Sequence, residues 1–237
     1  MTFFADDDVA WRADPHWQLV LIGNRDEYHA RAAAPLERWP ESPVIAGRDL
    51  QAGGTWMGVG PCGFGLVTNL RVPGYPRPNM TSRGRLIIDW LEGKAASGIE
   101  TMNPFNLWLG NAERLRFLSN YPEPHELELE PGIHGLSNGA RGDRWFKTAR
   151  LEDALALWLA EDCPAEDLFS ALADPTPESG DPEDAFSSVF IRNPAYGTRC
   201  STVVLVDQSG QGQIRERRFD PDGNCTGETR LDFEWQA

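Results

Sequence analysis

The alternation of apolar and polar positions along the chain predicts strands near both ends and helices between them. The apolar run 17–23 is typical of a buried strand that ends at Asn24. Two β-rich runs around a Gly/Pro turn, 53–59 and 64–70, indicate a hairpin. Further strands are expected at 105–109, 115–119, 186–192, 198–207, 213–219 and 226–235. Short turns separate the last three, which should form a meander.

Helical patterns occupy the middle of the chain. Ser82 is suited to cap a helix that runs through Leu91. Two further helices are expected at 148–160 and 165–173, the first with its apolar side chains on one face. The segments 28–43 and 174–184 are rich in proline and should be irregular. No repeat or break in composition divides the chain, so the pattern indicates a single α+β domain over residues 1–237.

Composition and charge exclude several classes of partner. The chain has 237 residues, 41% of them hydrophobic, and a net charge of −14. It lacks the clustered Lys and Arg that neutralise phosphates, which disfavours binding to nucleic acid or to an anionic membrane surface. No apolar stretch reaches the roughly 18 residues that span a bilayer, so no stable membrane insertion is expected.

The termini and the cysteines indicate a reduced compartment. The first residues turn acidic at Asp6-Asp7-Asp8 and carry no basic region, unlike a signal peptide. The four cysteines are dispersed and form no CxxC pair, which argues against a zinc site and a disulfide framework. We therefore expect a cytoplasmic protein with no metal site. The sequence does not predict its oligomeric state.

Polar side chains follow several of the predicted strands. Asn24-Arg25-Asp26-Glu27 follows the first strand, Thr68-Asn69 ends another, Ser137-Asn138 follows a glycine-rich run, and Tyr196-Gly197-Thr198-Arg199 precedes an apolar strand. Groups that end different strands of one sheet can converge on a shared edge, where pockets form. Arginine supplies donors for a carboxylate or an oxyanion, and asparagine can donate into an oxyanion hole. A solvated surface turn is the alternative explanation for each motif.

The same motifs, taken together, resemble the NRDE family, also called the transport and Golgi organisation protein 2 family. Asn24-Arg25-Asp26-Glu27 matches its opening motif. The segments 46–50 and 53–58 look like its second signature, which includes Arg48 and Trp56. Further matching motifs follow in the family's order: Thr68-Asn69, Ser82-Arg83-Gly84, 135–138, Trp145 with Lys147, 196–199, and Glu216-Arg217. The resemblance covers nearly the whole chain.

The resemblance implies an N-terminal nucleophile hydrolase fold, a four-layer αββα sandwich of two antiparallel sheets flanked by helices. Similar hydrolases of the choloylglycine and penicillin V acylase type use an N-terminal Cys followed by Arg, Asp, Asn, Asn and Arg. By this analogy the catalytic roles fall on five residues: Arg25, Asp26, Asn69, Asn138 and Arg199. Ligand-binding roles fall on Asn24, Glu27, Arg48 and Trp56.

The nucleophile is where this chain departs from the family. Members typically begin Met-Cys, whereas position 2 here is Thr; alignment on Trp11 instead puts Ala5 at the cysteine position. Thr2 with a free α-amine is a chemically competent substitute. Burial of an unpaired carboxylate costs several kcal/mol, so the run Asp6-Asp7-Asp8 predicts a shortened or displaced first strand.

Three functions therefore compete. The first is binding or trafficking of a small amphipathic ligand without a required cofactor; haem is one candidate ligand, since the resemblance implies a link to haem trafficking. His29, His134 and Cys163-Pro164 are the candidate haem ligands, although each is also explained as an ordinary loop or helix-start residue. The second function is hydrolysis of an amide C–N bond by Thr2. The third is a non-catalytic scaffold.

Overall fold

Two antiparallel β-sheets pack face to face in the computed structural model, which describes residues 5–161, 163–178 and 186–235. The six-stranded sheet has the order β10-β1-β2-β11-β12-β13. Its strands are β1 (Ala5–Trp11), β2 (Trp17–Tyr28), β10 (Gly132–Leu136), β11 (Tyr196–Asp207), β12 (Gln211–Phe219) and β13 (Cys225–Glu234). The seven-stranded sheet runs in chain order: β3 (Ala33–Arg38), β4 (Ile45–Asp49), β5 (Met57–Gly60), β6 (Gly63–Asn69), β7 (Phe105–Gly110), β8 (Leu115–Ser119) and β9 (His125–Leu129).

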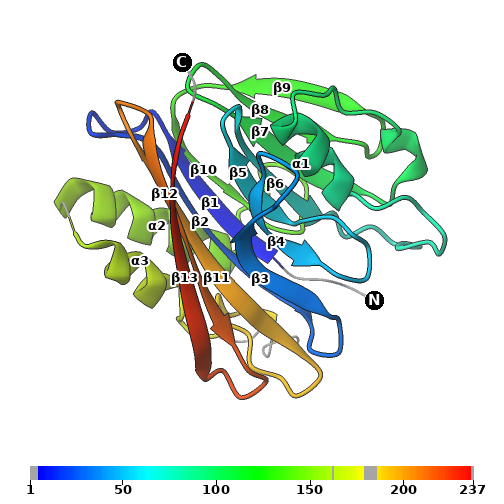
Figure 1. The fold of residues 1–237 in the computed structure, drawn as a ribbon. Helices are drawn as coiled ribbons and strands as arrows, with labels where there is room; N and C mark the ends of the chain where they lie inside the picture. Colours follow the sequence, from blue (N-terminus) through cyan, green and yellow to red (C-terminus); the bar gives the residue numbers. More distant parts are fainter. Residues whose placement is uncertain (1–4, 162, 179–185, 236–237) are drawn as a thin grey trace.

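Helices cover the outer faces of both sheets (Figure 1). Helix α1 (Gly84–Leu91) packs on β5 and β6 of the seven-stranded sheet, and a 3₁₀ turn, η1 (Ile99–Thr101), follows it. Helices α2 (Phe146–Glu161) and α3 (Ala165–Leu172) pack on the six-stranded sheet. This arrangement confirms the predicted αββα sandwich. None of the helices in the described segments is both long and apolar enough to cross a membrane.

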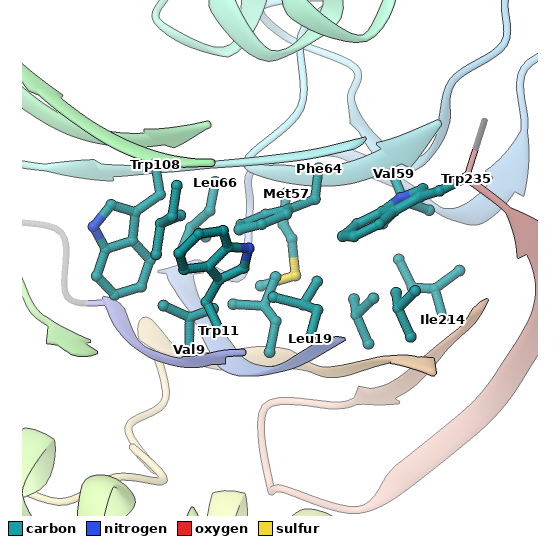
Figure 2. Close-up of a cluster of buried hydrophobic side chains, with 14 of the residues drawn as sticks. Val9, Trp11, Leu19, Met57, Val59, Phe64, Leu66, Trp108, Ile214 and Trp235 are labelled. Atoms are coloured by element: carbon teal, nitrogen blue, oxygen red, sulfur yellow. The ribbon is translucent and has the colours of Figure 1, made fainter. Parts of the chain in front are cut away.

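The main core fills the space between the two sheets (Figure 2). Because successive side chains of a strand point to opposite faces, alternate positions supply it. The six-stranded sheet contributes Val9, Trp11, Leu19 and Ile214, and the seven-stranded sheet contributes Met57, Val59, Phe64, Leu66 and Trp108. The intervening positions Val20 and Ile22 of β2 lie in a second cluster under α2 and α3.

The first strand contains the whole aspartate run, so the expectation that Asp6-Asp7-Asp8 displaces it was wrong. Any shortening of the strand before Ala5 concerns residues outside the described ones. β1 extends from Ala5 to Trp11 and pairs with both β2 and β10. Asp7 and Asp8 are buried within it, with exposed fractions of 3% and 0%. Both residues take part in interactions within the folded chain, so neither is an isolated buried charge.

Two other boundaries differ from the prediction. β2 does not end at Asn24 but continues to Tyr28, because β11 pairs with it as far as the Tyr196–Tyr28 position. The Asn24-Arg25-Asp26-Glu27 motif is therefore part of a strand and not a turn after one. The segment 28–43, expected to be irregular, contains β3, which pairs with β4.

The expected strand at 186–192 is absent although Val189, Phe190 and Ile191 are buried. Its backbone groups bond outside any ladder: the Phe190 N–H donates to the carbonyl of Asp174. The apolar run therefore correctly indicates that the segment is buried, but it does not form a β-strand. Ser82 does not cap α1; Arg83 occupies the cap position and makes no side-chain capping bond. The hairpin β5–β6, the helices α2 and α3, and the C-terminal meander are confirmed.

Candidate functional site

A cavity of about 340 Å³ opens where the polar ends of β1, β2 and β6 meet the N-terminus of α1. We call it the polar cavity. Of the residues predicted for the site, the structure brings seven to its lining: Asn24, Arg25, Asp26, Glu27, Trp56, Asn69 and Asn138. Three of the four polar motifs therefore contribute to one pocket, but they come from both sheets and not from a shared edge of one sheet, and the motif 196–199 does not line it.

Strand alternation divides the Asn24-Arg25-Asp26-Glu27 motif between two faces. The Nδ2 of Asn24 donates to the carbonyls of Leu172 and Val189, at 2.8 and 2.9 Å, on the side covered by α3. Asp26 accepts a hydrogen bond of 2.7 Å from the hydroxyl of Thr198. Arg25 and Glu27 are in phase with Leu19 and point toward the other sheet. These two therefore supply the side chains that face the cavity.

Arg25 is held against an aromatic ring. Its guanidinium carbon lies 4.3 Å from the centroid of the Trp56 ring, and its side chain is 8% exposed. Its Nη2 is 3.9 Å from Glu27 Oε2. The other terminal nitrogen, Nη1, is buried and has no hydrogen-bond partner among the described residues. A buried donor without a partner costs free energy that an acceptor on a ligand could recover.

Glu27 and Asp49 neutralise a second arginine at the cavity. Arg31 Nη2 lies 2.6 Å from Asp49 Oδ2, and Arg31 Nε lies 3.5 Å from Glu27 Oε2. Burial raises the pKa of Glu27 above its usual value, and this effect outweighs the N–H of Tyr28 and the charges of Arg25 and Arg31, which lower it. Glu27 can therefore gain a proton more readily than an exposed glutamate.

A third arginine, Arg83, precedes α1 and also lines the cavity. Its Nη1 donates to the carbonyl of Pro104 at 3.2 Å, and it forms no ion pair within the described part of the chain. Burial, together with the positive charge of Arg31, lowers the pKa of Arg83 to about 10. Burial is the larger of these two causes, so Arg83 is a poorly solvated guanidinium at the cavity wall.

Polar side chains of Asn138 and Thr68 link the two sheets at the cavity wall formed by β6 and the segment after β10. Asn138 Nδ2 donates to the backbone carbonyl of Asn69 at 2.7 Å, and the hydroxyl of Thr68 donates to the carbonyl of Ser137 at 3.2 Å. These bonds join β6 to the segment after β10, and so tie the two sheets together beside the cavity. Asp7 also lines the cavity, with its carboxylate over the Cα of Gly23.

Arg48 and Arg199 do not line the polar cavity. The guanidinium carbon of Arg48 lies 3.8 Å from the Trp39 ring centroid, in a separate cleft beside α1. Arg199 Nη1 donates to the carbonyls of Tyr28 and Arg31, both at 3.0 Å. Burial and the nearby charge of Arg25 lower the pKa of Arg199. Thr2 lies outside the described residues.

The candidate haem ligands are also elsewhere. His29 Nε2 is 3.0 Å from the carbonyl of Asn193, and His134 Nε2 is 2.8 Å from the carbonyl of Glu130. Cys163 packs beside the helical cluster of α2 and α3. The described lining of the polar cavity contains neither histidine nor cysteine.

Sequence reasoning missed Asp7, Asp49 and Arg83 as lining residues. Asp7 was treated only as a disruption of the first strand, and Asp49 and Arg83 only as members of family motifs. The motif Ser82-Arg83-Gly84 was the available signal, since it immediately precedes a predicted helix. From the sequence, this motif predicts a helix cap at Ser82 and assigns no binding role to Arg83.

Comparison with known proteins agrees with these motifs. The profile of the family "Transport and Golgi organisation 2" matches residues 8–221. The transport and Golgi organization 2 homologues of Mus musculus and Bos taurus are 27% and 29% identical to the chain; each alignment covers 85% of this chain and 86% of the relative. The transport and Golgi organization protein 2 of Drosophila melanogaster is 25% identical, with 93% of each protein covered. The chain therefore belongs to the Transport and Golgi organisation 2 family.

Proposed function

We propose that this protein binds a small amphipathic, anionic ligand in the polar cavity. The observation that carries the proposal is the buried Arg25, which lines the cavity and whose Nη1 has no hydrogen-bond partner in the described structure. An anionic oxygen would satisfy that donor and offset the positive charge around Arg25 and Arg83.

The rest of the lining suits the apolar part of such a ligand. Trp56, Leu66, Pro76 and Met80 line the cavity beside the charged groups. The volume of about 340 Å³ is at the lower end of the range of ligand pockets, about 300–1,000 Å³. The cavity therefore suits a ligand of modest size, or one end of a longer molecule.

Haem is one candidate ligand under this proposal. Its propionates are the kind of anionic group that Arg25 and Arg83 would hold. Because His29, His134 and Cys163 are not in the lining, the proposal does not include iron coordination by them.

The test compares two ligands that differ in charge. Calorimetric titration of the purified protein with octanoate and with octylamine should give saturable binding of the acid only. Arg25→Gln should weaken octanoate binding about tenfold, the scale of a lost charged hydrogen bond. Arg12→Gln is the matched control, because Arg12 also lies over a tryptophan, 5.5 Å from the Trp11 centroid, but does not line the polar cavity.

The proposal fails if octanoate does not bind, or if both variants bind it like the unmodified protein. A parallel titration with haem, followed at the Soret band, tests that candidate separately. A scaffold role would be favoured by two results together: the unmodified protein binds none of these ligands, and substitution of Arg25 unfolds it.

Amide hydrolysis by Thr2 is the second candidate, and the intact β1 favours it. Ala5, the first residue that the structure describes, pairs with Arg25 of the cavity motif. In this reaction the Thr2 oxygen attacks the amide carbon, and its proton passes through the α-amine to the leaving amine. Water then hydrolyses the resulting ester and restores the hydroxyl.

The hydrolase candidate requires a chain that begins at Thr2. Intact mass should show loss of Met1, and an electrophilic amide analogue should label Thr2 but not a Thr2→Val variant. Retention of Met1, or equal labelling of the two proteins, would eliminate it.

A further inference from the structure

The N-terminus of helix α1 opens onto the polar cavity. Ser82, Arg83 and Gly84 all contribute to the lining. The first turn of a helix carries N–H groups with no intrahelical acceptor and a partial positive charge. In α1 the cap residue Arg83 makes no side-chain capping bond, and the first turn contains no acidic residue. The Leu86 N–H donates to the carbonyl of Arg83 at 3.0 Å, so the available N–H groups are those of Gly84 and Arg85. The helix therefore presents uncompensated positive potential toward the cavity.

Close backbone packing fixes this helix end relative to Arg25. A Cβ on Gly84 would lie 2.5 Å from the carbonyl oxygen of Thr55, and a Cβ on Gly54 would lie 2.7 Å from the carbonyl carbon of Gly84. The next residue, Trp56, carries the ring against which Arg25 stacks. Two glycines thus bring the helix end and the buried arginine to the walls of one cavity.

The buried arginine is an independent sign of a ligand at this place. Arg25 is more than nine-tenths buried, and its Nη1 has no hydrogen-bond partner in the described segments. Arg83 adds a second guanidinium without an ion pair among the described residues. Arg31, in contrast, is already neutralised by Asp49 and Glu27.

We propose that the anionic group bound here is a phosphate monoester, held by Arg25, Arg83 and the N-terminal N–H groups of α1. This inference rests on the proposed function and narrows it. A carboxylate offers two oxygens in one plane and is satisfied by one guanidinium. A phosphate monoester offers three oxygens and close to two negative charges, and so can accept from donors on two walls at once. Helix N-termini are recurrent phosphate sites for this reason.

The test uses ligands with the same chain and different head groups. Octyl phosphate should bind at least about tenfold more tightly than octanoate, as measured by calorimetry. Arg83→Gln should remove most of that preference, and Arg83→Lys, which keeps the charge but loses the planar fork, should restore part of it. Arg85→Gln is the matched control on the same helix, since Arg85 is exposed, pairs with Asp89 and lies outside the cavity lining. Thermal unfolding of each variant checks that it remains folded.

Vesicle cosedimentation, with and without phosphatidic acid, distinguishes a lipid head group from a soluble ester. If the site is correct, Arg83→Gln must weaken binding of the phosphate ester in either form. The inference is overturned if octanoate binds as tightly as octyl phosphate, or if Arg83→Gln weakens both ligands equally. Absence of binding by either ligand would instead defeat the proposed function itself.

Discussion

Asn24 and Arg25 are neighbours in β2 and serve opposite faces of the six-stranded sheet. The amide of Asn24 bonds to Leu172 and Val189 on the helical side, whereas Arg25 stacks on Trp56 on the side of the other sheet. One residue therefore anchors a helix while the next faces the cavity.

Replacement of Asn24 should reduce stability and leave ligand binding intact. Asn24→Ala removes two donated bonds and the one that its Oδ1 accepts from Ser201 at 2.6 Å. We expect the free energy of unfolding to fall by about 2–3 kcal/mol, because buried partners lose their bonds. Urea unfolding measures the loss, and octanoate affinity should change by less than about twofold. A loss of affinity matching that of Arg25→Gln would contradict the division of faces.

Replacement of Trp56 should weaken anion binding without a large loss of stability. The stacked ring positions the Arg25 guanidinium, and a cation–π contact contributes about 0.5–2 kcal/mol. Trp56→Leu should therefore reduce octanoate affinity about three- to thirtyfold. Trp39→Leu is the control, because Trp39 stacks on Arg48 in the separate cleft. Equal effects of the two substitutions on affinity would argue against a specific role for Trp56.

Anion binding should strengthen as the pH falls. The raised pKa of Glu27 means that this carboxylate takes up a proton below neutral pH, which removes a negative charge near Arg25 and Arg31. Octanesulfonate is a suitable probe because it stays ionised. Its affinity should rise as the pH is lowered from neutral, because protonation of Glu27 removes a nearby negative charge. The Glu27→Gln variant should bind octanesulfonate more tightly at pH 7, and its affinity should depend less on pH. If the variant keeps the pH dependence of the unmodified protein, Glu27 is not the group responsible.

Glu216 should contribute strongly to stability because it joins the sheets. Its buried Oε1 accepts from the backbone N–H of Leu36 in β3, at 2.9 Å, and from Arg218 Nη1 at 3.0 Å. Glu216→Ala should lower the free energy of unfolding by about 2–3 kcal/mol, since the buried N–H of Leu36 loses its acceptor and Arg218 Nη1 keeps only its bond to Thr229. Glu228→Ala removes a carboxylate that is 58% exposed and paired with Arg217. That control should cost less than about 1 kcal/mol, and a comparable loss in both variants would contradict the role of Glu216.

The fold class was accessible from local pattern. The β5–β6 hairpin, the helices α2 and α3, and the β11–β13 meander follow from periodicity and turn residues. The failures lie where tertiary contacts overrule local preference. The segment containing Val189 is apolar but is not a strand, because its carbonyl accepts from Asn24 and its neighbours bond to loops. β1 persists although Asp7 and Asp8 are buried in it, because both residues take part in interactions within the folded chain.

Periodicity by itself determined the α+β class, because it acts over a few residues, and the motifs implied the family and its two-sheet sandwich. Of the five residues that the resemblance assigned to one site, Arg25, Asp26, Asn69 and Asn138 line the polar cavity and Arg199 does not. Only the tertiary structure decided which polar groups face the cavity. Arg83 reaches it through the contact of Gly84 with Thr55, whereas Arg48 and Arg199 are directed to other partners. The physical reason is that the alternation of a strand decides on which face of the sheet a side chain lies. The residues opposite it across the cavity are decided by packing between segments that are distant in the sequence.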